Sequence, residues 1–385
     1  MLKFFCPKCG KICEDAIRPV SCACGSPLKS SLHWTSFDVD KDGVGMWRYA
    51  PLLPAIDTSI SMGEGWTPLV AGRSENLFYK LEYISPTGSF KDRGAVIVIG
   101  EARSLGYEAV VQDSSGNAGA AVAAYAARGG IKATVVVPND TPEMKKRQIE
   151  DYGANLVVVK GGRSNAAAIA MEMAGSMFYA SHVWNPLFLE GTRTVAFEIW
   201  EQLGGKAPDA VIVPAGNGTM LLGVFKGFKE LLQRNRIKRL PKIIAVQAAN
   251  FAPLFEIWNN SPAAGDFQTT VAEGISVKEP PRMKEMIDAV RVSRGEVVVV
   301  SDGAILAEQE RLAREEGLLV EPTAAVAPAA ERMLRKSGAI TDRETVVVPL
   351  TGNGLKKPPS KRTKKQAPPE EERPLFSEYR KKVKE

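Results

Sequence analysis

A lysine follows a Pro-Thr-Gly turn at the predicted start of a helix. Residues 85–94 have the sequence SPTGSFKDRG, with Ser89 as the expected N-cap and Lys91 in the first helical turn. The positive end of the helix dipole and partial burial both favour the neutral form of an amine at this place. A neutral lysine can form an imine, so Lys91 is a candidate for covalent catalysis. Spacing alone leaves an alternative, a surface lysine in a charged Lys-Asp-Arg triplet.

Three further loops, rich in Gly, Ser, Asn and Thr, each follow a short apolar run. Residues 113–119 (DSSGNAG) can turn backbone N–H groups toward an anion such as a carboxylate. Residues 214–219 (PAGNGT) allow close approach of a phosphate, with Thr219 as a hydroxyl donor. Residues 349–354 (PLTGNG) form the last loop. Taken singly, each loop has a simpler interpretation. The first is more often a strand-to-helix turn capped by Asn117, the second is a lone Gly-x-Gly and a weak signal, and the third is a terminal turn.

Five cysteines lie within the first 24 residues, and four of them form two knuckle-like pairs. Cys6 and Cys9 flank a C-x-x-C turn, whereas Cys22 and Cys24 form the shorter C-x-C. Thiolates at this spacing are typical of a structural zinc site, and Cys13 is either a substitute ligand or a free thiol. A redox-active or inert Cys-rich segment is the alternative.

The candidate loops need strands and helices that bring them to one place. Short apolar runs predict buried strands at residues 110–112, 133–137, 156–159, 210–213, 243–246, 297–300 and 346–348. Helical spacing or Ala-rich composition predicts helices at residues 119–128, 143–152 and 191–202. This alternation predicts α/β layers with parallel-type sheets. Ligands of such sheets bind at the carboxyl ends of the strands, where the candidate loops lie.

The loops and their order resemble those of the fold-type II pyridoxal-phosphate (PLP) enzymes, and among these most closely the threonine synthases. The resemblance is carried by the segments GEGWTPL at 63–69, PTGSFKDRG at 86–94, SSGNAGAAVAAYAARGGI at 114–131, NPLFLEGT at 185–192 and LTGNGLK at 350–356. They span about three-quarters of the chain. The resemblance implies a two-domain fold with the cofactor between the domains, and a homodimer.

The resemblance also implies a role for each matching residue. Lys91 would form a Schiff base with PLP and then move protons, Asn117 would hydrogen-bond the phenolic oxygen of the cofactor, and Thr351 would face its pyridine nitrogen. The cofactor phosphate would lie against Gly216, Asn217, Gly218 and Thr219, and the substrate carboxylate against Ser114, Ser115, Gly116 and Asn117. A hydroxyl does not keep the pyridine nitrogen protonated, which favours elimination and replacement over transamination.

The implied activity is that of a lyase that converts O-phospho-L-homoserine and water to L-threonine and phosphate. Phe188 stands where the family often has an arginine, and Arg193 is the nearby cation that could take over its contact with a phosphorylated substrate. Residues 272–275 (AEGI) are similar to a segment of dehydratases and of cysteate synthase. Two other enzymes therefore stay open: an O-phosphoserine β-replacement enzyme, either a cysteate synthase or a sulfhydrylase, and a threonine/serine dehydratase.

The expected organisation has four parts. Residues 1–30 form the zinc-ribbon-like segment, residues 31–94 and 186–355 the large PLP-binding domain, residues 95–185 a small inserted α/β domain, and residues 356–385 a basic, disordered tail.

The formal net charge of +6 is confined to the tail, which has eleven Lys or Arg and five Asp or Glu, whereas residues 1–355 carry 39 of each sign. A ribbon with a basic tail is compatible with a nucleic-acid-binding protein. The short ribbon lacks clustered aromatics and arginines, which argues against nucleic acid, and the family resemblance implies a small amino-acid substrate instead. No apolar stretch is long enough for a membrane helix, and we expect a cytoplasmic protein.

Overall fold

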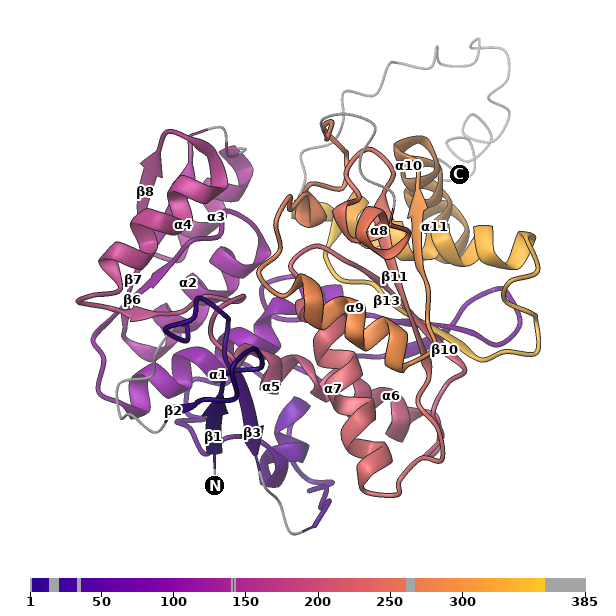
Figure 1. The fold of residues 1–385 in the computed structure, drawn as a ribbon, viewed down its shortest axis with the longest axis horizontal. Coiled ribbons are helices and arrows are strands. Elements are labelled where there is room, and N and C mark those ends of the chain that lie inside the picture. Colours follow the sequence, from indigo (N-terminus) through magenta and orange to yellow (C-terminus); the bar gives the residue numbers. More distant parts are fainter. Residues whose placement is uncertain are drawn as a thin grey trace, which may run out of the picture.

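The computed structural model describes residues 2–13, 21–32, 36–139, 141, 143–260 and 267–356. These residues form three sheets, a small antiparallel one near the N-terminus and two larger ones that lie side by side in Figure 1. The larger sheets are covered by helices, so the predicted α/β class with parallel-type sheets is confirmed. Residues 357–385 of the basic tail and residues 14–20 of the ribbon lie outside the described residues.

The N-terminal ribbon is an antiparallel sheet of order β2-β1-β3. Its strands are β1 (Leu2–Phe5), β2 (Ile12–Cys13) and β3 (Lys29–Leu32). Phe4, Cys6, Cys22 and Leu28 are buried in the same apolar cluster as residues of the first two helices. The ribbon is therefore packed onto the body of the protein.

The larger sheet has six strands in the order β12-β11-β10-β13-β5-β4, and only the edge strand β4 runs antiparallel to its neighbour. The strands are β4 (Leu69–Ala71), β5 (Leu77–Lys80), β10 (Ala210–Pro214), β11 (Lys242–Ala248), β12 (Val297–Val300) and β13 (Val346–Pro349). Apolar clusters place α6 (Thr194–Gln202), α7 (Thr219–Gln233), α8 (Pro253–Trp258) and α9 (Met283–Val292) on one face, and α10 (Asp302–Arg311) and α11 (Pro322–Lys336) on the other.

The second sheet has four parallel strands in the order β8-β7-β6-β9. They are β6 (Ala109–Gln112), β7 (Lys132–Pro138), β8 (Asn155–Val159) and β9 (Phe178–Tyr179). One face packs on α1 (Lys91–Ser104), α2 (Asn117–Gly129) and α3 (Glu143–Asp151), and the other on α4 (Gly162–Met173). The short α5 (Phe188–Thr192) leads the chain back to the six-stranded sheet. The four strands thus lie in sequence between β5 and β10, although the domain boundaries themselves stay a prediction.

All seven predicted strands are present, and the helices predicted at 119–128, 143–152 and 191–202 correspond to α2, α3 and the α5–α6 pair. The predicted N-cap is wrong. Phe90 occupies the cap position of α1, and the buried Ser89 hydroxyl has no hydrogen-bond partner among the described residues. Ser89 pairs in an isolated β-bridge with Gly352, and its backbone carbonyl, rather than its hydroxyl, accepts a hydrogen bond from the Asp92 N–H over 3.4 Å.

Candidate active site

A cavity of about 650 Å³ lies where β6, β10 and β13 end, between the two larger sheets. Its lining combines loops that are far apart in the sequence but meet because parallel strands present their carboxyl ends together. Every cofactor- and substrate-binding residue predicted from the sequence lines this cavity: Lys91, Ser114, Ser115, Gly116, Asn117, Gly216, Asn217, Gly218, Thr219 and Thr351.

Lys91 is the first residue of α1 and points into the cavity rather than to the outer surface. Its Nζ donates a hydrogen bond to Thr219 Oγ1 over 3.0 Å and lies 4.8 Å from the ring centre of Phe90. Burial lowers the pKa of this amine to about 7, although the carboxylate of Glu321 acts in the opposite direction. A substantial fraction of the amine is therefore neutral near pH 7, as imine chemistry requires.

The loop before α7 is shaped to bring its backbone close to a ligand. Gly218 has a φ of +82°, which favours glycine, and a Cβ on Gly216 would lie only 2.8 Å from the Cα of Ile275. Thr219 begins the fifteen-residue α7, whose first N–H groups are left without helical partners. The loop and helix start can therefore bind an anion such as a phosphate.

The loop before α2 crosses the cavity from the four-stranded sheet. The Ser114 hydroxyl accepts a hydrogen bond from the Gly116 N–H over 3.3 Å, and Asn117 begins α2. A Cβ on Gly119 would lie 1.9 Å from the Ser114 carbonyl oxygen, so glycine is required for the loop to fold back on the helix.

Thr351 presents a buried hydroxyl whose Oγ1 has no hydrogen-bond partner among the described residues. A buried hydroxyl without a partner is costly and marks a place where a ligand can supply the missing contact. A near-neutral amine, an anion-binding helix start and an unsatisfied hydroxyl line the same cavity. They suit a ligand with an aldehyde, a phosphate and a ring nitrogen, which are the functional groups of PLP.

Comparisons with known proteins agree with this geometry. The family model described as "Pyridoxal-phosphate dependent enzyme" matches residues 60–352. This chain belongs to the pyridoxal-phosphate-dependent enzymes. It is 35% identical to the threonine synthase of Methanocaldococcus jannaschii over 376 residues, which cover 92% of each chain. It is also 36% identical to that of Mycobacterium tuberculosis over 321 residues, covering 80% of this chain and 88% of the relative. These matches place it with the PLP-dependent lyases.

Solved structures of related enzymes share the fold. O-ureido-L-serine synthase matches with a TM-score of 0.64 at 24% identity, covering 75% of this chain and 90% of that one. A fungal L-serine ammonia-lyase from Rhizomucor miehei matches with a TM-score of 0.65 at 24% identity, covering 74% and 93%.

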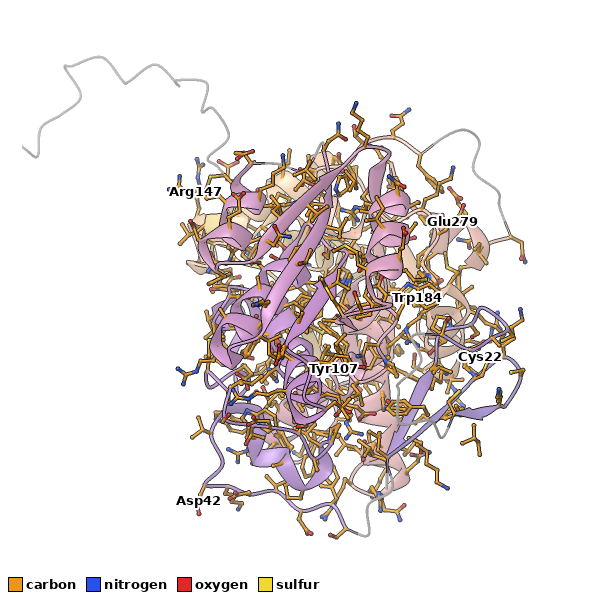
Figure 2. The ribbon with its side chains drawn as sticks, turned by 90° about the vertical axis from the view of Figure 1, so that its left-hand side faces the viewer. Cys22, Asp42, Tyr107, Arg147, Trp184 and Glu279 are labelled. Atoms are coloured by element: carbon orange, nitrogen blue, oxygen red, sulfur yellow. The ribbon has the colours of Figure 1, made fainter. Side chains whose placement is uncertain are left out.

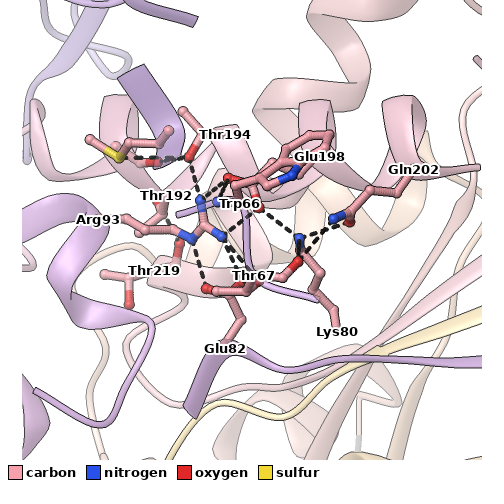
Figure 3. A network of polar contacts seen from close by, with 12 residues as sticks. Trp66, Thr67, Lys80, Glu82, Arg93, Thr192, Thr194, Glu198, Gln202 and Thr219 are labelled. Carbon is pink, nitrogen blue, oxygen red and sulfur yellow. Dashed lines mark hydrogen bonds and ion pairs between the residues drawn. The ribbon is translucent and has the colours of Figure 1, made fainter. Parts of the chain in front are cut away.

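Figure 3 shows a buried polar network around Arg93, which lies in the first turn of α1 of this PLP-dependent enzyme. Arg93, two residues after Lys91, forms ion pairs with Glu82 over 2.7 Å and with Glu198, and Lys80 pairs with Glu198 over 2.6 Å. All four side chains are fully buried. The network ties the first turn of α1 to β5 and α6, and thereby fixes the helix that carries Lys91.

Three polar residues of the cavity were missed as functional residues by the sequence analysis. Glu321 precedes α11, Lys356 follows the last loop, and both hydrogen-bond the side chain of Asn117. His182 lies beside Asn217, with 3.3 Å between Nε2 and Nδ2. Burial, together with Lys91 and Arg163, lowers the pKa of His182 well below its usual value, so its imidazole is neutral. The Glu-Pro pair at the start of α11 was the available signal for Glu321.

The AEGI segment lies at the mouth of the cavity of this PLP enzyme. Glu273 pairs with Lys145 of α3 over 2.6 Å, and its carbonyl oxygen accepts a hydrogen bond from Arg163 of α4 over 3.2 Å. These contacts join the large sheet to two helices of the four-stranded sheet.

Phe188 and Arg193, the two residues considered for contact with a phosphorylated substrate, are both buried in the structure. Phe188 is fully buried, and its ring centre lies 5.6 Å from Lys91 Nζ. A Cβ on Gly94 would lie 2.3 Å from this ring, so the two helices pack closely here. Neither Phe188 nor Arg193 lines the cavity, and Arg193 pairs with Glu230 over 2.7 Å and with Glu190 over 3.1 Å. Arg193 therefore does not compensate for the arginine that Phe188 replaces.

The four predicted metal ligands lie together. The sulfur atoms of Cys6, Cys9, Cys22 and Cys24 are all within 4.8 Å of one another, and Cys13 is not a member of this group. The sulfur atoms of Cys6 and Cys24 are 3.5 Å apart, and those of Cys9 and Cys22 are 3.6 Å apart. In Figure 2, Cys22 marks the ribbon at one edge of the molecule.

The ribbon contacts the wall of the cavity through a buried arginine. Arg282 donates to the Leu28 carbonyl oxygen over 3.0 Å and to the Val183 carbonyl oxygen over 2.7 Å. Val183 lines the cavity beside His182.

None of the helices in the described part of the chain has the length and apolar character needed to cross a bilayer.

Proposed function

We propose that this enzyme is a threonine synthase, which converts O-phospho-L-homoserine and water to L-threonine and phosphate. The observation that carries this proposal is the match to an archaeal threonine synthase over 92% of both chains. The cavity supports it because the residues that would bind the cofactor and an amino-acid carboxylate lie around one reactive lysine.

In this proposal, PLP is bound by Lys91, Asn117, residues 216–219 and Thr351. When bound, PLP withdraws electrons from the substrate and so stabilises negative charge at its carbon atoms. Lys91 would remove one proton from Cα and one from Cβ of the substrate, and would return one to Cα and deliver one to Cγ after the phosphate has left, while water adds at Cβ. Its pKa of about 7 suits a general acid and base near neutral pH. The hydrogen bond to Thr219 keeps the amine directed into the cavity.

The other loops would orient the two ligands. The backbone of residues 114–117 would bind the substrate carboxylate, and the N-terminus of α7 would bind the cofactor phosphate. Thr351 would face the pyridine nitrogen with a neutral hydroxyl, which leaves that nitrogen unprotonated and favours elimination and replacement. The ion pair between Lys145 and Glu273 would limit the entry into the cavity of water molecules other than the one that reacts.

The test compares the wild type with the Lys91→Ala variant. We expect an absorption band of lysine-bound PLP only in the wild type, followed by release of phosphate and formation of threonine in equal amounts when O-phospho-L-homoserine is added. Absence of the band in the wild type would refute the cofactor site. Presence of the band without turnover of O-phospho-L-homoserine would refute only the choice of substrate.

Phe188 favours a second candidate, a threonine/serine dehydratase. The family resemblance implies an arginine at this position, and the fully buried ring of Phe188 offers no cation to a phosphate ester, whereas a free hydroxy amino acid needs none. Formation of a 2-oxo acid and ammonia from threonine or serine, without use of phosphorylated substrates, would identify this activity. Consumption of O-phosphoserine alone would instead identify a β-replacement enzyme.

We also propose a structural zinc ion bound by Cys6, Cys9, Cys22 and Cys24. Tetrahedral Zn–S bonds of about 2.3 Å give sulfur separations of about 3.8 Å, close to those of the ribbon. Metal analysis of the purified protein tests this proposal, and a protein that is folded and active without metal would contradict it.

A further inference from the structure

The carboxamide of Asn117 lies between two side chains of opposite charge. Its Nδ2 donates a hydrogen bond to Glu321 Oε1 over 3.0 Å. Its Oδ1 accepts a hydrogen bond from Lys356 Nζ over 2.7 Å. All three residues line the cavity that contains Lys91.

These two contacts permit only one orientation of the amide. An ammonium group only donates hydrogen bonds and a carboxylate only accepts them. A flipped amide would place its NH₂ group against the ammonium and its oxygen against the carboxylate, and both contacts would be repulsive. With the amide in the observed orientation, one N–H of Nδ2 remains for a ligand in the cavity.

The two charged residues are themselves fixed by the loop that follows β13. The Glu321 N–H donates to the Gly352 carbonyl oxygen over 3.0 Å, and a Cβ on Gly352 would lie 2.2 Å from Glu321 Oε1. The stem of Lys356 passes over Gly88, where a Cβ would lie 3.5 Å from the lysine Cδ. The loop that carries Thr351 therefore also determines where the two charges stand.

We propose that Glu321 and Lys356 are positioning residues, which orient the Asn117 carboxamide so that one N–H points to the phenolic oxygen of PLP. The inference rests on the proposed cofactor site. It adds two residues that lie outside the loops proposed to bind the cofactor directly. It also assigns a function to Lys356, the last residue of the segment LTGNGLK. Both charges also act on the bound cofactor, in opposite directions.

Other charged groups face the pair and are the background for any pH measurement. Lys356 lies near Asp92 and Lys145, and Glu321 lies near Lys145, Glu273 and Lys91. None of them is altered in the test below, so their contribution is common to all variants.

The test uses the Lys356→Met and Glu321→Gln variants of the full chain. PLP affinity is measured by titration of the apo-protein, and the absorption band of lysine-bound PLP is followed with pH. Loss of the proton from the bound cofactor makes its net charge more negative, which the Lys356 ammonium favours and the Glu321 carboxylate opposes. We expect the midpoint to rise by about one pH unit in Lys356→Met and to fall by about one in Glu321→Gln. We also expect PLP to bind about tenfold more weakly in both.

A matched pair of controls separates positioning from general loss of stability. Lys226 and Glu190 form an ion pair over 2.6 Å and do not line the cavity. The Lys226→Met and Glu190→Gln variants should lower the melting temperature but leave the midpoint of the absorption band unchanged. Midpoints that stay at the wild-type value in Lys356→Met and Glu321→Gln, or that move in the same direction, would overturn the inference. A wild type that binds no PLP would instead overturn the proposed function.

Discussion

The Lys91 amine and the Thr219 hydroxyl are joined by a hydrogen bond of 3.0 Å across the cavity. They are the first residues of α1 and α7, and these helices pack on different sheets. The group that would form the imine is thereby placed against the helix start that would bind the cofactor phosphate. One hydrogen bond thus spans the two halves of the proposed cofactor site.

Replacement of Thr219 tests this relationship. Thr219→Val preserves the shape of the side chain but removes the hydroxyl, so both Lys91 and a bound phosphate lose a partner. We expect PLP to bind about tenfold more weakly, the effect of losing roughly one hydrogen bond to a charged group. Titration of the apo-protein by absorbance measures the affinity. Thr219→Ser retains the hydroxyl and should restore most of it, and equal losses in both variants would argue against a role of the hydroxyl.

The lowered pKa of Lys91 predicts how the rate at which the apo-protein forms an imine with added PLP depends on pH. Attack on the aldehyde requires the neutral amine, whose fraction rises as the pH increases through about 7. The rate of imine formation in the apo-protein should therefore increase across this range and level off above it. Stopped-flow absorbance measures this rate. A rate that still increases about tenfold per pH unit near pH 9 would show an ordinary lysine pKa.

Phe188→Arg tests whether the apolar ring limits the use of phosphorylated substrates. If the enzyme acts on O-phospho-L-homoserine, an added cation near Lys91 should lower its KM for that substrate. The guanidinium would also be buried, which we expect to reduce stability by about 3 kcal/mol. Phe188→Leu is the control for lost packing and should leave KM unchanged. An unaltered KM in Phe188→Arg would show that this position does not contact the substrate.

Glu198 is the centre of the buried network behind α1. Burial alone would raise its pKa, but Arg93 and Lys80 outweigh burial and bring the pKa down to about 2. An unfolded glutamate titrates at about 4.3, so the stabilisation is complete above that pH and is lost as the pH falls toward about 2. Glu198→Gln should lower the free energy of unfolding at pH 7 by about 3 kcal/mol or more, and the difference from wild type should shrink in acid. Urea unfolding at several pH values measures both effects.

Removal of a ribbon cysteine tests the metal proposal and its link to the cavity. Cys9→Ser should abolish zinc binding and lower the melting temperature, because the ribbon is packed on the core and its Leu28 carbonyl is bonded to Arg282. Cys13→Ser should retain zinc, since Cys13 lies outside the group of four. Metal content and melting curves of the two variants provide the comparison. Zinc retained in Cys9→Ser would exclude the proposed ligand set.

The sequence predicts those parts of the site that depend on short-range sequence patterns. Buried strands such as β10 and β13 are continuous apolar runs, and each ends in a glycine-containing loop, so both the strand and its ligand-binding end are recognisable. The edge strand β4 and its neighbour β5 lack this pattern and were not predicted. The family resemblance then supplied the roles of Lys91 and the loops.

The parts that escaped prediction depend on contacts between distant segments. Asn117 meets Glu321 and Lys356 across 204 and 239 residues of sequence. Arg193 has the charge expected of a substrate ligand, but its position at the start of α6 directs it to Glu190 and Glu230 instead of the cavity. Residue type and order do not determine which way such a side chain points, because helix packing does.

The position of β13 has a consequence for biosynthesis. This strand, the last of the six-stranded sheet, lies in its interior between β10 and β5, and its pairing with β5 joins residues 77–80 to 346–349. During synthesis on the ribosome, β4 and β5 can therefore pair with the rest of the sheet only after β13 has been made. The Thr351 loop is made later still, so a nascent chain that lacks it has an incomplete pocket, and we expect PLP to bind only after this loop has left the ribosome.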